Sequence, residues 1–222
     1  MIVGLFRAPL DLEPDQLETF AATLSAEELA RAEALRAPQA RRRWIADHGW
    51  RRRLLADWLP TRSPSQLTFT DNGHGKPRLA GAGPHFSASR SEDVAWYAIS
   101  DQAEVGVDVE RIDRDRPLER LAQRLLSTRE RAIYESMPAA ERAAALYACW
   151  TCKEAAVKAL GTGLVFPLTA LEAWTHDGAP MRAGGLEIRG LTTEPGRTAA
   201  VAVRIETQDT VAIEPVVDLS SP

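Results

Sequence analysis

The chain has 222 residues, of which 45% are hydrophobic, and its 27 basic and 31 acidic side chains give a formal charge of −4. This composition is typical of a soluble globular protein, and the length suits one large domain or two domains of about a hundred residues each. No apolar run approaches the roughly 18 residues of a membrane helix, no signal peptide is recognisable, and two cysteines cannot form the disulfide framework of a small secreted domain. We therefore expect a cytoplasmic protein without membrane contact.

The first third of the chain is predicted to be helical. Ser25, followed three residues later by Glu28, forms a capping box that predicts a helix ending near Pro38. A second helix is predicted from Arg41 to Leu59, because apolar residues recur there at helical spacing and prolines follow. Residues 71–77 are dense in turn formers, which predicts an exposed loop.

Short strands are predicted after this loop, where alternating polarity and β-branched residues are frequent. Similar segments return near the C-terminus. The predicted strands are His85–Ser89, Asp93–Ile99, Glu104–Glu110, Ala199–Glu206 and Val211–Val217.

Helices are predicted between the two groups of strands. Ser127 and Glu130 form a second capping box, which starts a helix at that point. Pro138 suits the first turn of a long helix that runs to Leu160, and Gly161 suits its left-handed C-cap.

The order of helices, strands, helices and strands predicts an α+β fold with two similar-sized lobes, each with helices packed on a small, mostly antiparallel sheet. We place the seam near residues 101–104, so that residues 1–103 form the N-terminal lobe and residues 104–222 form the C-terminal lobe. No sequence repeat is strong enough to prove a duplication.

Lysine is rare in this chain. Of the 27 basic residues only Lys76, Lys153 and Lys158 are lysines, and the others are arginines. A lysine ammonium is compact and can release a proton, whereas a guanidinium is planar and always charged. Codon bias and a chemical need for lysine explain this distribution equally well until the neighbouring residues are considered.

Asp108 and Glu110 lie two residues apart on a predicted strand, so both carboxylates point to the same face. Adjacent anions repel each other and need a cation between them or good solvation. Oxygen ligands of this kind suit Mg²⁺. Taken alone, the motif is more simply interpreted as an exposed strand edge neutralised by Arg111 and Arg114.

Trp150, Glu154 and Lys158 are spaced four residues apart on the long predicted helix and share one stripe. A surface ion pair between Glu154 and Lys158 explains their spacing. If the stripe faces a cleft instead, Lys158 and the adjacent Lys153 would contact a bound polyanion. Spacing alone does not choose between these interpretations.

Four motifs in order carry a family resemblance. Gly106-Val107-Asp108-Val109-Glu110 is followed about forty residues later by Trp150-x-x-Lys153-Glu154-Ala155-x-x-Lys158-x-x-Gly161-x-Gly163-Leu164. Upstream are Gly75-Lys76-Pro77-x-Leu79 and His85-Phe86-Ser87-x-Ser89. This combination, which runs from about residue 24 to residue 168, resembles the signature of the 4'-phosphopantetheinyl transferases, specifically the Sfp type.

The resemblance implies a magnesium-dependent transfer of the phosphopantetheine arm of coenzyme A to a serine of an apo acyl or peptidyl carrier protein, with release of 3',5'-ADP. It also implies metal ligands at Asp108, Glu110 and Glu154, which would hold Mg²⁺ or Mn²⁺ against the pyrophosphate of coenzyme A. Glu154 would be the base for the carrier serine. Lys158 would steady or protonate the leaving phosphate, and Lys153 would lie beside the same pyrophosphate.

Further site residues follow from the same resemblance. The nucleotide end of coenzyme A, including its 3'-phosphate, is expected near a group of basic and small residues: Arg31, Arg43, Lys76, Pro77, His85 and Ser89. Glu28 departs from the family, where a lysine is common. The carrier protein is expected to contact Leu164, Val165 and Phe166, and the enzyme is expected to be a monomer whose two lobes, related by a pseudo-two-fold axis, enclose the active site in a cleft.

Two other interpretations are considered. The segment Arg31–Arg53 carries eight arginines against two acidic residues, and with its tryptophans it could form a nucleic-acid-binding module. A solvated helix face that partly lines the 3'-phosphate pocket is the simpler interpretation, and we expect no nucleic-acid partner. Cys149 and Cys152 match a C-x-x-C pattern, but they lie inside a predicted helix without further zinc ligands, so ordinary helix residues are expected.

Overall fold

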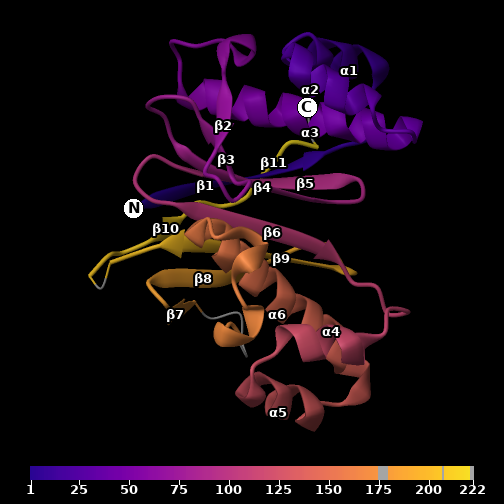
Figure 1. The fold of residues 1–222 in the computed structure, drawn as a ribbon, viewed down its shortest axis with the longest axis vertical. Coiled ribbons are helices and arrows are strands. Elements are labelled where there is room, and N and C mark those ends of the chain that lie inside the picture. The colour runs from indigo at the N-terminus through magenta and orange to yellow at the C-terminus, as the bar shows by residue number, and fades with distance from the viewer. Residues whose placement is uncertain (175–179, 207, 221–222) are drawn as a thin grey trace.

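Two sheets with helices outside them make up the computed structural model, which describes residues 1–174, 180–206 and 208–220 (Figure 1). The first sheet has the strand order β10-β1-β5-β4, with β11 also paired to β1, and the second has the order β6-β9-β8-β7. Only β10 and β11 pair in parallel, both with β1. The strands of these sheets are β1 (Ile2–Pro9), β4 (His85–Ser91), β5 (Val94–Ser100), β6 (Val105–Arg111), β7 (Met181–Ala183), β8 (Leu186–Leu191), β9 (Arg197–Arg204), β10 (Ala212–Ile213) and β11 (Val217–Asp218).

The described residues form six α-helices, a small hairpin and three short 3₁₀ turns. The helices are α1 (Pro14–Ala21), α2 (Ala26–Glu33), α3 (Pro38–Trp58), α4 (Leu118–Leu125), α5 (Thr128–Ser136) and α6 (Ala139–Leu160). The hairpin consists of β2 (Phe69–Asp71) and β3 (Pro77–Leu79), and the 3₁₀ turns are η1 (Pro64–Gln66), η2 (Gly163–Val165) and η3 (Leu168–Ala170).

The first sheet is buried on both faces, because alternate side chains of a strand point in opposite directions. On β5, Tyr97 and Ile99 pack with the aromatic residues Phe20 of α1 and Trp50 of α3. Trp96 and Ala98, which alternate with these residues along the strand, belong to a different cluster, shared with β6 and β9 of the second sheet. The two sheets therefore pack against each other, and α1–α3 cover the outer face of the first (Figure 1).

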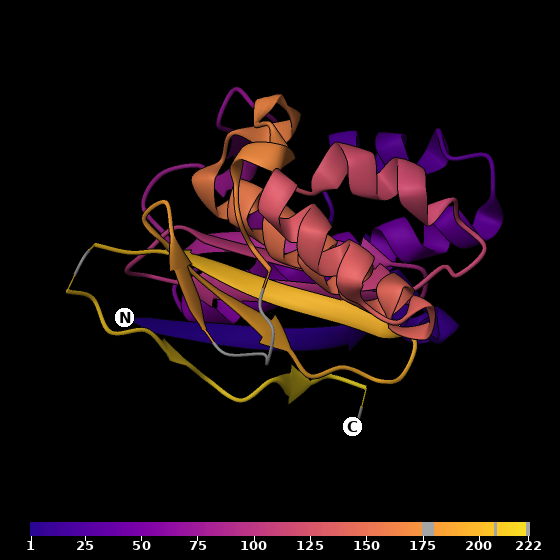
Figure 2. The same ribbon diagram turned by 90° about the horizontal axis from the view of Figure 1, so that it is seen from below.

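The outer face of the second sheet carries α6, which crosses β9 obliquely (Figure 2). The helix rests directly on β6 at Gly106, where a Cβ atom would lie 1.9 Å from the carbonyl oxygen of Ala155 and 2.5 Å from the backbone nitrogen of Ala159. Only glycine permits this close approach. The second sheet and α6 are thus in backbone contact at the strand that bears Asp108.

The helices with local start and stop signals are confirmed. Both capping boxes form, since Ser25 accepts from the backbone of Glu28 and Ser127 accepts from the backbone of Glu130, with the reciprocal bonds present. The long helix α6 begins directly after Pro138 and ends at Gly161, whose φ of 69° is left-handed. The α+β class is confirmed as well, since helices and mostly antiparallel sheets occupy separate segments.

The prediction that the first third is helical is wrong for its first residues. Residues 2–9 form β1, which lies in the middle of the first sheet between β5 and the C-terminal strands. The predicted strand at 211–217 is broken into β10 and β11, which both return to β1. The division at residue 103 stays a prediction, and the structure adds that the two ends of the chain share one sheet.

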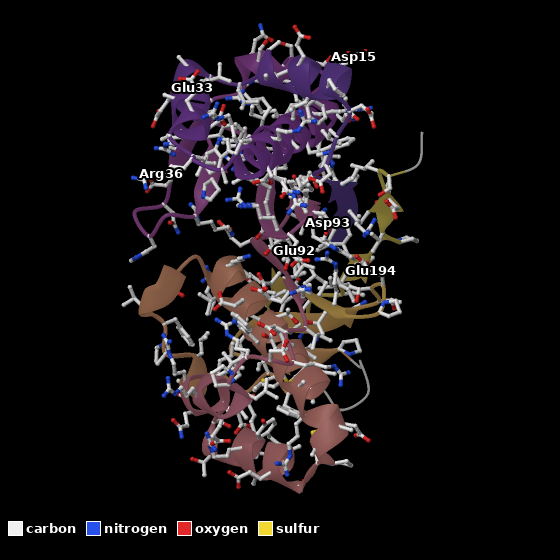
Figure 3. The ribbon with its side chains drawn as sticks, turned by 90° about the vertical axis from the view of Figure 1, so that its right-hand side faces the viewer. Asp15, Glu33, Arg36, Glu92, Asp93 and Glu194 are labelled. Atoms are coloured by element: carbon white, nitrogen blue, oxygen red, sulfur yellow. The ribbon has the colours of Figure 1, made fainter. Side chains whose placement is uncertain are left out.

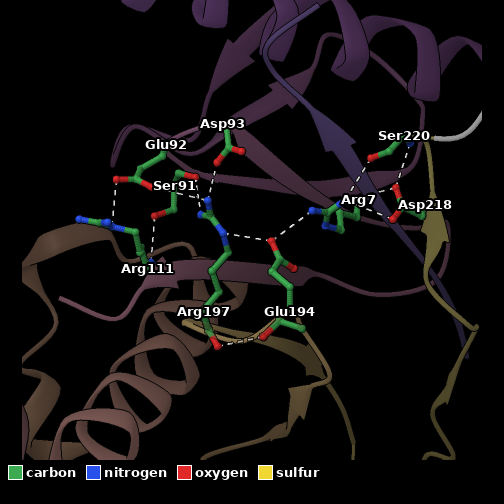
Figure 4. A network of polar contacts seen from close by, with 10 residues as sticks. Arg7, Ser91, Glu92, Asp93, Arg111, Glu194, Arg197, Asp218 and Ser220 are labelled. Atoms are coloured by element: carbon green, nitrogen blue, oxygen red, sulfur yellow. Dashed lines mark hydrogen bonds and ion pairs between the residues drawn. The ribbon is translucent and has the colours of Figure 1, made fainter. Parts of the chain in front are cut away.

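A polar network joins the two sheets and the C-terminal segment (Figure 4). Arg7 of β1 donates to Asp218 of β11 and to Glu194, each at 3.1 Å. Glu194 also receives Arg197 of β9 at 3.0 Å, and Arg197 in turn pairs with Asp93. Figure 3 shows Asp93 and Glu194 at the level where the sheets meet. These ion pairs link β1, β9 and β11, and so reinforce the contact that the hydrophobic core makes between the two sheets.

Within the described residues, no helix has the combination of length and apolar character that crossing a membrane requires.

Candidate active site

Three serines on β4 face β6, the outer strand of the neighbouring sheet. Ser87 Oγ accepts a hydrogen bond from the N–H of Val107 at 3.1 Å, and Ser91 Oγ accepts from the N–H of Arg111 at 3.0 Å. Because β6 has no strand partner on this side among the described residues, these hydroxyls satisfy backbone groups that would otherwise be unpaired. Side chains of β4 thus hold β6 in position beside the first sheet.

Asp108 lies at this junction, on the face of β6 that α6 covers, and only 4% of it is exposed. Its Oδ1 accepts hydrogen bonds from Ser89 Oγ at 2.7 Å and from Lys158 Nζ at 2.8 Å. Its Oδ2 is buried, and no donor among the described residues reaches it. A buried carboxylate oxygen without a partner is unfavourable, so this atom calls for a cation or another donor.

Glu110 and Glu154 are half-buried carboxylates near Asp108. Burial, followed by the negative charge of Asp108, raises the pKa of Glu110 to about 7. The same two causes, in the same order, raise the pKa of Glu154. Strand and helix therefore bring three acidic residues close enough for their charges to repel, which is the electrostatic setting of a cation site.

The donor set fits a divalent cation that arrives with a phosphate ligand. No group of three or more His, Cys, Asp or Glu side chains within the described ranges is already arranged as a metal cage. Mg²⁺, however, usually keeps several waters and is held by one or two carboxylates together with substrate phosphates. The unpartnered Oδ2 of Asp108, with two further carboxylates in electrostatic range, has the chemistry of such a ligand.

Lys158 connects α6 to both sheets. In addition to Asp108, its ammonium donates to the carbonyl oxygen of Val107 at 3.1 Å and to that of Ala88 at 3.4 Å. The side chain keeps 29% of its surface exposed. Lys158 thus lies at the candidate site, and in this structure its three donors all have protein partners.

Lys153 does not reach the candidate site, and the prediction that it lies beside the pyrophosphate is wrong. Its side chain is completely buried, and its ammonium contacts Glu130 at 2.5 Å and the carbonyl oxygens of Leu125 and Leu168. The carboxylate of Glu130 also accepts from the backbone of Ser127 and of Ala173. Adjacent positions on a helix point about 100° apart. Lys153 therefore faces α5 and the η3 turn, whereas the next residue, Glu154, faces the candidate site.

Lys76, Pro77 and His85 come together in a pocket of about 220 Å³ that Glu104 also lines. Glu104 accepts from Lys76 at 2.6 Å and lies 3.2 Å from His85 Nδ1. Asn72 fixes the loop before Lys76 by donating to the carbonyl oxygen of Gly161 at the end of α6. Residues 76–86 and Glu104 thus line one basic pocket with an acidic residue in it, and Glu104 was not predicted from the sequence.

Arg31 and Arg43 do not line this pocket. Arg31 is exposed and pairs with Glu27, whereas Arg43 pairs with Asp11 at 2.6 Å. Glu28, which stands where the family often has lysine, receives the buried Arg52. Three of the eight arginines of the Arg31–Arg53 segment are therefore paired with acidic residues, which weakens the nucleic-acid interpretation.

A second pocket, of about 430 Å³, opens beside Glu154 between α4, α6 and the η2 turn. Trp150 and Phe166 give it apolar walls, and Arg116 and Arg124 add positive charge. Neither arginine was predicted, because Arg116, before α4, and Arg124, within it, belong to no recognisable motif. Val165 is 81% exposed next to this pocket, and the Leu164 side chain lies outside what the structure describes.

Cys149 and Cys152 are both buried within α6.

The raised pKa of Glu110 predicts a specific pH dependence of stability. The folded protein holds this proton more tightly than the unfolded chain, whose glutamate has the ordinary value of 4.5. The free energy of unfolding of the metal-free protein should therefore fall as the pH rises from 4.5 to about 7, and should not recover above that range. Urea unfolding over this range checks the slope. Glu110→Gln should flatten it, and Glu141→Gln, an exposed control on α6, should not; equal slopes in both variants would contradict the assignment.

Comparison with known proteins gives a consistent result. A family model described as the 4'-phosphopantetheinyl transferase superfamily matches residues 104–201. The chain is 38% identical over 166 residues to the 4'-phosphopantetheinyl transferase HetI of Nostoc sp.. The matched region covers 73% of this chain and 70% of HetI. It is 36% identical over 142 residues to AcpT of Salmonella typhimurium, a 4'-phosphopantetheinyl transferase, covering 63% and 70%. It is 34% identical over 148 residues to a putative 4'-phosphopantetheinyl transferase of Synechocystis sp., covering 65% and 60%.

Proposed function

This chain belongs to the 4'-phosphopantetheinyl transferase superfamily, and we propose that the junction of β4, β6 and α6 is the place where it catalyses that reaction. The enzyme transfers the phosphopantetheine arm of coenzyme A to a serine of an apo carrier protein, with release of 3',5'-ADP. The single observation that carries the location is the buried, unpartnered Oδ2 of Asp108 beside Glu110 and Glu154. The nucleic-acid alternative gains no support from the relatives.

Asp108, Glu110 and Glu154 would hold Mg²⁺, or Mn²⁺ in its place. When bound, the cation neutralises negative charge on the pyrophosphate during phosphoryl transfer. Asp108 would contribute its free Oδ2, since Oδ1 already accepts from Ser89 and Lys158. Glu110 and Glu154 would lose their mutual repulsion with Asp108 on binding, which makes the occupied site more favourable than the empty one.

Glu154 is the proposed general base. Its raised pKa makes it a better proton acceptor than an ordinary glutamate at neutral pH. Its carboxylate takes the proton of the carrier serine, directly or through water, as the serine oxygen bonds to the phosphorus that bears the pantetheine. The bond from that phosphorus to the bridging oxygen breaks, and the leaving phosphate of 3',5'-ADP takes the electron pair.

Lys158 is proposed to steady this leaving phosphate or to protonate it. For this its ammonium would exchange a hydrogen bond to a backbone carbonyl oxygen for one to the phosphate. Lys158→Arg should lower kcat roughly a hundredfold, because a planar guanidinium neither fits the three compact contacts of the ammonium nor releases a proton. Steady-state labelling of a carrier protein measures this effect. Near-normal turnover would remove Lys158 from the leaving-group role.

The nucleotide end of coenzyme A is proposed to occupy the pocket of Lys76, Pro77 and His85. Arg31 and Arg43, on the helices that cover the first sheet, would extend the contact only by exchanging their present acidic partners for the 3'-phosphate. We further propose the Sfp type, a cytoplasmic monomer, and a pseudo-two-fold arrangement in which residues 1–103 and 104–222 enclose the site in a cleft. One pocket is lined by residues 76–86 and Glu104, and the other by residues 116–168, which supports contributions from both segments.

The carrier protein is proposed to dock on Leu164, Val165 and Phe166. Replacing all three with serine should raise KM for the carrier at least about tenfold with kcat unchanged, because burial of even one aliphatic or aromatic side chain contributes about 1.5–3 kcal/mol. Val217→Ser, at an exposed valine on β11, serves as the matched control. Unchanged KM in the triple variant would end this assignment.

The proposed function is tested by incubating the protein with fluorescent coenzyme A, Mg²⁺ and a panel of apo carrier proteins. Label should move to at least one carrier and should stop when a chelator is added. No transfer to any carrier with Mg²⁺ or Mn²⁺ present would refute the function.

A further inference from the structure

We propose that Ser89 is a positioning residue that orients the Asp108 carboxylate, so that Oδ2 alone is presented to the metal. This inference rests on the proposed metal site and assigns to Ser89 a role other than contact with coenzyme A. Ser89 lies on β4 of the first sheet, whereas Asp108 lies on β6 of the second. The orientation of the ligand is therefore controlled across the junction between the sheets.

The geometry of the two donors explains the orientation. A carboxylate can rotate about its bond to Cβ, and this rotation exchanges its oxygens. Ser89 Oγ at 2.7 Å and Lys158 Nζ at 2.8 Å both donate to Oδ1, one from a strand and the other from a helix. Two donors from separate elements on a single oxygen hold the rotation, and the second oxygen is left buried and unpartnered.

The position of Ser89 is itself well defined. It pairs with Trp96 of β5 in the register of the first sheet, and its neighbours Ser87 and Ser91 accept hydrogen bonds from the β6 backbone. These neighbours have the same hydroxyl on the same face of β4, but neither contacts a carboxylate. Among the three serines that face β6, only Ser89 donates to Asp108.

Ser89 complements Lys158 in charge as well as in position. Lys158 brings a positive charge to Asp108. This charge partly neutralises the carboxylate and so weakens its attraction for a metal ion. A hydroxyl donor orients the oxygen without adding charge. Partners of this kind beside a metal ligand typically contribute about 10- to 100-fold to metal affinity or activity. Replacing the hydroxyl should therefore weaken metal binding while the charge of the site stays the same.

The experiment measures Mn²⁺ affinity from the EPR signal of free Mn²⁺, with saturating coenzyme A and the full-length protein. Ser89→Ala should bind Mn²⁺ about tenfold more weakly than the wild type. Ser89→Thr, which keeps the hydroxyl, should restore most of the affinity. Ser91→Ala is the matched control, since it removes a hydroxyl from the same strand face that bonds only to the backbone of Arg111 (Figure 4). Thermal unfolding of all three variants establishes that each is folded at the assay temperature.

The outcomes separate this inference from the proposed function. Tight binding by the wild type, weak binding by Ser89→Ala and unchanged binding by Ser91→Ala support the positioning role. Wild-type affinity in Ser89→Ala, or an equal loss in Ser91→Ala, overturns it while the metal site stands. No Mn²⁺ binding by the wild type overturns the metal site and this inference together.

Discussion

Asp108→Asn is expected to reduce carrier labelling by at least about a hundredfold while the protein remains folded. The asparagine has the same shape, and its amide oxygen can still accept from Ser89 and Lys158 at the position of Oδ1. Its amide nitrogen would then replace Oδ2, and a nitrogen that carries two hydrogens cannot bind a cation. Loss of a ligand should exceed the effect of losing a ligand's hydrogen-bond partner, which is about 10- to 100-fold.

Three measurements make this expectation decisive. Labelling with coenzyme A gives the activity, a Mn²⁺ titration gives the metal affinity, and thermal unfolding reports the fold. Asp101→Asn is the control, because this exposed aspartate lies shortly before β6. If Asp108→Asn bound Mn²⁺ and labelled carriers like the wild type, Asp108 would not be a metal ligand.

Lys153→Met is expected to have the largest effect on stability. Removal of one partner of a buried ion pair costs about 3–5 kcal/mol, because the other charge stays buried without compensation. Lys153 is fully buried, and its partner Glu130 is 1% exposed. For a protein of this size, each kcal/mol lowers Tm by roughly 2–4 °C, so a decrease of about 10 °C is expected.

The double variant Lys153→Met with Glu130→Gln separates the ion pair from the packing around it. It should be more stable than Lys153→Met alone, since no unpaired charge remains; the coupling energy is the destabilisation of the double variant minus the sum of those of the two single variants. Urea unfolding of the wild type, both single variants and the double variant completes the cycle. An unchanged stability of Lys153→Met combined with loss of labelling would return Lys153 to the catalytic residues.

The parts of the fold that could be predicted depend on local signals. The capping boxes at Ser25 and Ser127 and the glycine at 161 each act within one helical turn, and the helices they bound were confirmed. The strand β1 was missed because its stability comes from β5, about ninety residues later, and from the C-terminal strands. No window of sequence around residues 2–9 contains those partners.

The candidate site shows the same division. The i, i+2 spacing of Asp108 and Glu110 predicts that they share a face, and the pKa of Glu110, raised by burial and then by the charge of Asp108, agrees with this proximity. The role of Lys153 was not predictable, because helical spacing does not say which neighbour covers each side of α6. Its buried partner Glu130 was recognised only as a capping residue, although the same carboxylate also receives Lys153. The contribution of Glu104 was missed because it depends on a loop fixed to the end of α6.

Gly106 has a consequence for how the reaction centre could be lost. It touches the backbone of α6 beside Glu154 and Lys158, two positions before Asp108 on the strand. A methyl group there would lift the helix and move one set of charged groups away from the other. A genetic screen for inactive enzyme should therefore recover substitutions at a position that binds nothing, and a second mutation that trims the helix surface would be needed to compensate. The distance between β6 and α6 at the candidate site therefore depends on the absence of a side chain at Gly106.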